Sequence, residues 1–280
     1  GAQNYGSSFL PAVYQGTRIG QLGQSLKTAT IGNLKNPRLD RSQQRRQIDF
    51  VQSLNRGLLE KRQSDEQLES VIESYELAFR MQMSVPEALN MSGETAETQR
   101  LYGIDQGPTK TAGQRLLVAR RMVERGVRFV QVYYGNGQPW DTHHGHNART
   151  ASLCRDIDRP IAALLDDLAR SGLLEDTLVV WGGEFGRTIY SQGKLTDTNY
   201  GRDHHPRCFT IWLAGGGVKP GLTFGASDPY GYNIESDGVH VHDFHATLLH
   251  LLGIDHERLI YKHRGRRYRL TDVFGKVVRP

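Results

Sequence analysis

Two short apolar runs on either side of a long amphipathic stretch constrain the fold of this chain more than any other feature. Residues 127–134 form the first run, 148–171 have the periodicity of a helix, and 177–181 form the second run. Strand, helix and strand at this spacing predict a parallel βαβ unit with a right-handed crossover. A further apolar run at 209–213 extends the expectation to an α/β fold with a mostly parallel central sheet. In such sheets ligands gather at the carboxyl ends of the strands.

The segments before this unit have different patterns. Residues 1–38 show neither helical nor strand periodicity, and we expect an ordered loop there. Residues 41–83 have the pattern of a pair of charged surface helices, the second of which Pro86 is expected to end. The chain is therefore expected to divide into a loop and helical cap, residues 1–110, and an α/β domain, residues 111–280.

Three more elements are expected inside the second region. A helix begins at Thr111 and stops at Gly126, and another runs from Val241 to Leu252 before a glycine. The last segment alternates well enough to predict a short hairpin within 259–278, where basic residues crowd. We interpret that basic run as a solvated face of the hairpin, which makes nucleic acid an unlikely partner.

Composition bounds the class of protein. The chain has 280 residues, of which 38% are hydrophobic, enough for a core, and its net charge is a mild +5. No run of about 18 apolar residues exists, so no membrane span is expected, and no export signal is present in this chain. It begins at Gly1, which favours an upstream segment that has been removed. Cys154 and Cys208 are too few for a disulfide framework, and we interpret both as buried thiols.

A histidine-rich turn follows the first apolar run. Asp141, His143, His144 and His146 offer up to four metal ligands within six residues. Carboxylate and neutral imidazole suit zinc, manganese or iron better than calcium, which prefers oxygen ligands. The alternative is a solvent-exposed turn without a metal, but its position after a strand favours the site.

Two further turns carry groups of the same kind. Glu184 follows the second apolar run directly and supplies a carboxylate, while Arg187 can offer a bidentate fork to a phosphate or sulfate. The alternative is a structural Glu–Arg pair. Asp203 and His204 stand next to each other, which is common for a ligand and its supporting group, or for a capped loop with exposed histidines.

The three turns together resemble a bacterial sulfatase-like family of unknown function within the alkaline phosphatase-like superfamily. The matching residues are Trp-Asp-Thr-His at 140–143, Gly-Glu-Phe-Gly-Arg-Thr at 183–188 and Gly-Arg-Asp-His at 201–204. The resemblance covers nearly the whole chain. It implies an alkaline phosphatase-like α/β sandwich whose N-terminal portion is missing here, since family members are longer at that end and carry an export signal. A periplasmic or exported location follows from the same resemblance.

The resemblance also implies a metal-dependent hydrolase of sulfate or phosphate esters. The expected metal ligands are Asp141, His143, Glu184, Asp203 and His204, with Arg187 and Arg202 binding the substrate anion. One or two divalent ions, zinc or manganese, would be held there. The number of ions stays open because Phe185 stands where members of the superfamily carry a second ligand. The nucleophile is expected upstream, so no catalytic residue is assigned and this fragment is expected to be inactive. The rival hypothesis is a non-catalytic binding protein for sulfated or phosphorylated polymers.

Overall fold

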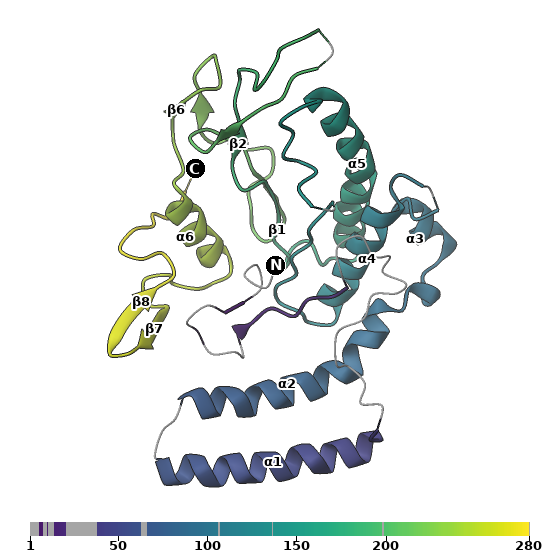
Figure 1. The fold of residues 1–280 in the computed structure, drawn as a ribbon, viewed down its shortest axis with the longest axis vertical. Helices are drawn as coiled ribbons and strands as arrows, with labels where there is room; N and C mark the ends of the chain where they lie inside the picture. Colours follow the sequence, from purple (N-terminus) through teal and green to yellow (C-terminus); the bar gives the residue numbers. More distant parts are fainter. Residues whose placement is uncertain are drawn as a thin grey trace. The chain divides into compact units, whose positions relative to one another are not determined.

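The computed structural model of the chain forms two compact units, Gly1–Gly137 and Gln138–Pro280 (Figure 1). The structure describes residues 6–7, 10, 14–20, 38–62, 66–105, 107–135, 137–197 and 199–279. Most of the loop expected over residues 1–38 lies outside this described part. Of the described helices, none combines the length and the apolar character that crossing a membrane requires.

Two long helices form the first part of the first unit. Helix α1, Arg41–Arg62, and helix α2, Glu66–Leu89, confirm the predicted helix pair and lie side by side (Figure 1). Arg45 joins them, because its Nη1 and Nη2 donate hydrogen bonds to Glu76 at 2.9 and 3.1 Å. The prediction that Pro86 ends the second helix is wrong. Helix α2 continues past this proline to Leu89, and the Pro86 carbonyl accepts a hydrogen bond from the Asn90 N–H at 3.1 Å.

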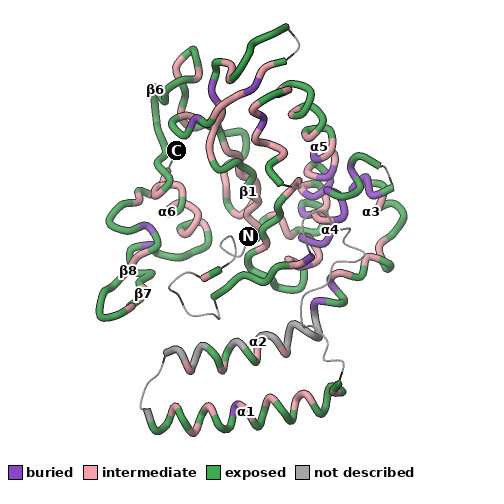
Figure 2. The backbone as a smooth tube through the Cα atoms, viewed as in Figure 1, coloured by how far each residue is buried: buried purple, intermediate pink, exposed green. Residues whose placement is uncertain are grey.

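Helix α4, Lys110–Glu124, supplies much of the core of the first unit. Val118 and Met122 of α4 pack against Val85 and Ala88 of α2 in one apolar cluster. The short helices between α2 and α4 are η4, Met91–Gly93, and α3, Ala96–Leu101. Figure 2 shows buried residues along α4. Helix α4 confirms the helix that the apolar spacing of this segment predicts.

The first expected strand does not form. Residues 127–134 follow α4 as irregular chain with no strand assignment, and Phe129 within them is 79% exposed. An apolar run becomes a strand only when a neighbouring strand accepts its backbone hydrogen bonds. Within the described residues, no other segment pairs with 127–134.

Helix α5, His146–Arg170, opens the second unit and confirms the predicted helix. Ile157, Leu164 and Leu168 are buried on one face, as the period of 3.6 residues predicts. Cys154 lies on the exposed face of the same helix and Cys208 is partly exposed, so the expectation of two buried thiols is wrong.

Four two-stranded antiparallel sheets occur in the described part of the second unit, and the expected mostly parallel central sheet is wrong. Strand β1, Val179–Trp181, pairs with β4, Trp212–Ala214, and the two run in opposite directions. The remaining pairs are β2, Gly186–Arg187, with β3, His204–His205; β5, Ala226–Ser227, with β6, Ile234–Ser236; and β7, Ile260–His263, with β8, Arg266–Arg269.

The pairing of β1 with β4 explains why the alkaline phosphatase-like sandwich fails as a fold assignment. Both predicted strands exist in shortened form, but an apolar run carries no information about strand direction. The chain leaves β1, makes a long excursion and returns along it antiparallel, which places Trp181 opposite Trp212 with ring centroids 6.2 Å apart and planes within 9°.

The C-terminal part of the second unit contains one helix and one hairpin. Helix α6, Val241–Leu251, confirms the prediction and starts with a capping box, in which the Asp243 side chain accepts a hydrogen bond from the His240 N–H. The β7–β8 hairpin confirms the alternation seen in the sequence. His256 and Thr271 are buried and share a hydrogen bond of 2.9 Å.

Candidate metal centre

The β2–β3 pair brings two of the expected site residues to one face. In its antiparallel register Arg187 lies directly opposite His204, and Gly186 lies opposite His205. Directly opposed residues of a sheet point to the same side, so Arg187 and His204 share a face. His205 points the other way, where it is buried and its Nε2 bonds to the Tyr232 carbonyl at 2.7 Å.

The third residue of the site comes from the turn before α5. Backbone hydrogen bonds hold this turn against the segment before β3: the Arg202 N–H donates to the Thr142 carbonyl at 3.0 Å, and the His146 N–H donates to the Tyr200 carbonyl at 3.0 Å. Gly201 permits the close approach, because a Cβ atom there would lie 1.9 Å from the His143 carbonyl oxygen. The Asp141 turn is thereby fixed beside His204.

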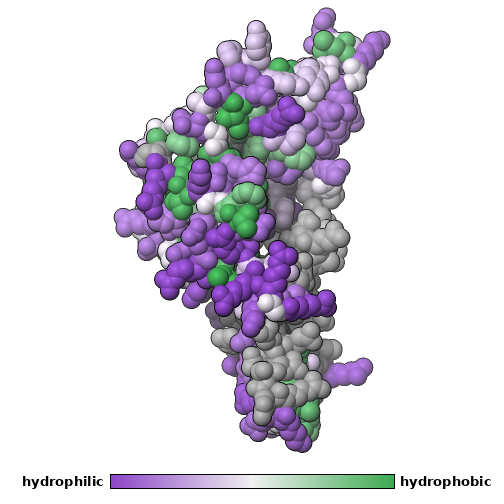
Figure 3. Space-filling model, turned by 90° about the vertical axis from the view of Figure 1, so that its left-hand side faces the viewer, coloured by the Kyte–Doolittle hydropathy of each residue, from purple (hydrophilic) through white to green (hydrophobic). Residues whose placement is uncertain are grey.

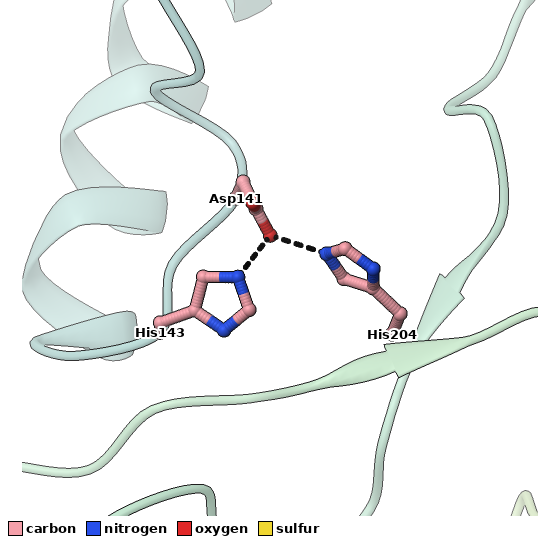
Figure 4. A group of neighbouring side chains, drawn as sticks. All are labelled: Asp141, His143 and His204. Atoms are coloured by element: carbon pink, nitrogen blue, oxygen red, sulfur yellow. Dashed lines mark hydrogen bonds and ion pairs between the residues drawn. The ribbon is translucent and has the colours of Figure 1, made fainter.

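Three ligand groups converge at this point. Asp141 Oδ1 lies 3.0 Å from His143 Nε2 and 2.9 Å from His204 Nε2 (Figure 4). One ligand atom from each residue lies within 4.8 Å of the others. Asp141 and His204 are far apart in sequence, so the convergence is a product of the fold.

Arg187 adds a guanidinium group to the same point. Its Nη2 donates a 2.9 Å hydrogen bond to Glu184 Oε1, and its Nη1 lies 3.1 Å from Asp141 Oδ1. The contact to Asp141 has ion-pair distance but not hydrogen-bond geometry, and among the described residues the buried Nη1 has no hydrogen-bond acceptor. The described residues therefore leave the hydrogen-bonding capacity of this buried N–H group unused.

The ring of Phe185 packs on both neighbours. It lies 4.9 Å from the His204 ring and 5.4 Å from the Arg187 guanidinium carbon, measured from its centroid. A phenyl ring cannot bind a metal, but here it packs against the His204 imidazole and the Arg187 guanidinium and restricts their orientation. Phe185 therefore has a positioning role at the turn where relatives were expected to carry a second ligand.

The surroundings keep Asp141 ionised. Burial raises the pKa of its carboxyl group, but hydrogen bonds from His204 and His143 and the charge of Arg187 outweigh burial, so the pKa is lowered overall. An ionised carboxylate is the form that binds a metal ion.

Gln192 contacts the far nitrogen of His143, and nothing in the sequence marked it. Its side-chain oxygen contacts His143 Nδ1, and this contact is the main reason that the pKa of His143 is raised, with Asp141 adding to it and burial opposing it. With Nδ1 held by Gln192, Nε2 is the nitrogen that faces Asp141, and it is the nitrogen that would bind a metal ion in place of the proton it shares with that carboxylate. Metal-binding histidines are commonly held in this way by a partner on the other nitrogen.

His146, one of the four candidates in the turn, is occupied elsewhere. Its Nδ1 lies 2.6 Å from the hydroxyl of Thr142, which is fully buried, and burial together with the charges of Arg202 and Arg187 lowers the pKa of His146. His144 is likewise not part of the three-residue cluster. The turn thus contributes two ligand groups, Asp141 and His143.

The remaining expected site residues lie around the cluster rather than in it. The Glu184 side chain is 59% exposed and holds Arg187, as the alternative of a structural pair described. Asp203 Oδ1 accepts a hydrogen bond from the N–H of His204 at 2.7 Å. Arg202 Nη1 donates to the Thr188 carbonyl at 2.7 Å, and its guanidinium lies over the Tyr200 ring.

The donor set fits a divalent transition metal. Catalytic zinc sites use three protein ligands, with metal–nitrogen and metal–oxygen distances of about 2.0–2.2 Å, and leave one position open. Two imidazole nitrogens and one ionised carboxylate lie within 4.8 Å of one another, a spacing compatible with ligands of a single ion. The partial exposure of His204 leaves a side of the cluster open to solvent.

One family model matches the chain, over residues 1–280, with the description "Protein of unknown function (DUF1501)". The chain belongs to this family. No curated protein and no solved structure matches it. Membership establishes the coarse part of the expected resemblance, a family of unknown function, and carries no statement about sulfatases.

Proposed function

We propose that this chain binds one divalent metal ion through Asp141, His143 and His204 and that the site acts on sulfate or phosphate esters. The observation that carries the proposal is the convergence of two imidazole nitrogens on the oxygen of an ionised carboxylate, beside an Arg187 Nη1 that has no hydrogen-bond acceptor among the described residues. The three ligands need only a metal ion. Arg187 carries a positive charge beside them and favours an anion bound next to that ion.

Each residue has a distinct part in this proposal. A bound metal ion would polarise an ester oxygen as a Lewis acid. Arg187 would donate from Nη1 to a second oxygen of the same tetrahedral anion, while Glu184 holds its Nη2. Phe185 and Gln192 keep His204 and His143 in place. No described residue is assigned as the nucleophile.

Metal binding is tested by titrating the chelator-treated chain with Zn²⁺ or Mn²⁺ in a calorimeter. We expect one ion per chain, and a loss of affinity of at least about tenfold in His204→Gln, because one of three ligands is removed. The matched control is His250→Gln, which changes an exposed histidine in the last turn of α6. Equal metal affinity in His204→Gln and the wild type would contradict the proposed metal centre.

Anion binding is tested separately on the metal-loaded chain with inorganic phosphate and sulfate. We expect Arg187→Lys to keep the metal and bind either anion more weakly, because lysine keeps the charge but lacks the planar fork. Arg207→Lys, at an exposed position, is the control. Ester hydrolysis is then measured in the full-length gene product, where turnover that survives His204→Gln would contradict the proposed role of the metal.

A further inference from the structure

The β7–β8 hairpin ends in a tight turn that carries a basic residue. Arg264 and Gly265 form its two-residue loop, with φ angles of 48° and 80°. Positive φ at both positions is the geometry of a type I′ hairpin turn, which usually takes Asn or Asp before Gly. An arginine in the left-handed region is uncommon, so the sequence places a charge at the tip where backbone preference would select another residue.

One face of the hairpin is basic and exposed. Lys262 lies directly opposite Arg267, and both side chains are exposed, as is Arg264 at the tip. Figure 3 shows the side of the molecule on which the hairpin and α6 lie, where hydrophilic groups predominate between scattered hydrophobic ones. Among the described residues, Lys262, Arg264 and Arg267 form no ion pair. Arg269, in the same hairpin, pairs with Glu257 at 3.7 Å.

Like charges directly opposite each other destabilise an antiparallel strand pair. Lys262 and Arg267 therefore repel each other in a hairpin whose described contacts contain no carboxylate between them. An external anion that bridges the two side chains would remove this repulsion. Several basic side chains spread along one face of a hairpin suit a polymer with repeated anionic groups better than a single small anion.

The aromatic residues on the opposite face of the hairpin disfavour nucleic acid as the bound polyanion. Tyr261 and Tyr268 are only partly exposed, and each already has a neighbour: the Arg266 guanidinium lies 5.0 Å over the Tyr268 ring, and the His263 ring stacks on Tyr261 at 6.3 Å. Single-stranded nucleic acid binds where free aromatic rings accept stacked bases. The basic face of this hairpin contains no aromatic ring.

A membrane surface is also disfavoured by the arrangement. Hairpins and helices that enter a membrane interface lead with apolar side chains. Here the charges occupy the tip, while the exposed apolar residues Leu259, Ile260 and Leu270 lie at the base. A sulfated polysaccharide matches this face, because it offers dense negative charge without bases and without an apolar layer.

We propose that the basic face of the β7–β8 hairpin, formed by Lys262, Arg264 and Arg267, binds a sulfated polysaccharide. The binding itself is independent of the metal centre. The further suggestion that this polymer is the substrate rests on the proposed function. In that case the polymer held by the hairpin would carry the ester that the Asp141 site acts on.

The test uses heparin as the probe and measures its affinity for the whole chain by calorimetry at moderate salt. Replacing Lys262, Arg264 and Arg267 with Gln should weaken binding by about tenfold or more, because three charged contacts are lost together. The matched control replaces Arg155, Lys194 and Lys219 with Gln, which removes the same charge from other exposed positions. Thermal unfolding of both variants checks that the fold is kept.

Three outcomes would overturn the proposal. Equal weakening in the two triple variants would show that only net charge matters. Tighter binding of a single-stranded oligonucleotide than of heparin would assign the face to nucleic acid, and binding to anionic lipid vesicles with no binding to heparin would assign it to a membrane. His204→Gln separates the two proposals: retained heparin affinity with lost metal supports the hairpin site, whereas metal loss that abolishes heparin binding contradicts its independence.

Discussion

Gly201 packs tightly on the backbone of His143, in the turn that carries the candidate ligand Asp141. A Cβ atom at Gly201 would lie 1.9 Å from the carbonyl oxygen of His143 and 2.1 Å from its carbonyl carbon. The atoms in contact are backbone, so no flexible side chain can move aside. The turn and the strand that carries His204 must separate if position 201 gains a side chain.

Gly201→Ala should therefore reduce both stability and metal affinity. We expect an overpacking cost of about 1–3 kcal/mol in the free energy of unfolding, measured with urea. Gly107→Ala is the control, since a Cβ atom at Gly107 meets nothing within 4 Å. Wild-type stability together with wild-type zinc affinity in Gly201→Ala would show that the turn tolerates displacement.

Gln192→Leu should lower metal affinity while leaving the three ligands in place. The leucine removes the acceptor that fixes the tautomer of His143, and the loss of such a partner typically costs about 10–100-fold in affinity. Calorimetric titration with Zn²⁺ measures it. Gln192→Glu keeps an acceptor oxygen and should retain much of the wild-type affinity. Unchanged affinity in both variants would leave Gln192 without a role.

Glu184→Gln separates a ligand from a partner of Arg187. Because Glu184 is exposed and contacts Arg187 rather than the cluster, we expect zinc affinity to stay within a factor of about two and stability to fall by less than about 1 kcal/mol. Metal content and thermal unfolding are measured on the same preparation. A steep fall in metal content would restore Glu184 to the ligand set expected from the sequence.

Asp228 gives the second unit a pH dependence that does not involve the candidate metal site. Its carboxylate accepts hydrogen bonds from the N–H groups of Tyr230, Tyr232 and Asn233, and the bond from Tyr232 contributes most to lowering its pKa. A carboxyl group with a lowered pKa stabilises the folded state fully above its unfolded pKa of about 3.9 and loses this contribution as pH falls through the folded value.

The test compares the wild type with Asp228→Asn in urea unfolding from neutral pH down to about pH 2. The variant should be less stable than the wild type at neutral pH, and the two should approach each other below about pH 4. A stability difference that is constant over the whole range would show that the charge of Asp228 has no part in holding this loop.

Helices were the most predictable part of the fold because their signal is local. The apolar spacing of Ile157, Leu164 and Leu168 is complete within one segment, and α5 forms as expected. Strand direction depends on a partner elsewhere in the chain. The runs at 127–134 and 209–213 look equally apolar, yet the first forms no strand and the second contributes to β4, antiparallel to β1.

The candidate site was predictable only as far as residue chemistry alone marks it. Asp141, His143 and His204 stand in turns with ligand-type neighbours, so a sequence can nominate them. Glu184 and Asp203 carry the same chemistry, and only the geometry shows that they hold Arg187 and the His204 backbone instead. Gln192 and Gly201 act through contacts between distant segments, for which neither residue type has a signature.

The stacked rings of Trp181 and Trp212 give the short β1–β4 pair an optical signature of its own. The two indoles come from segments on either side of the β2–β3 pair in sequence and lie parallel only while their strands are paired. Separation of the two rings would change the surroundings of both indoles, so tryptophan fluorescence can follow the opening of this strand pair. The circular dichroism of helices follows the melting of α5 separately.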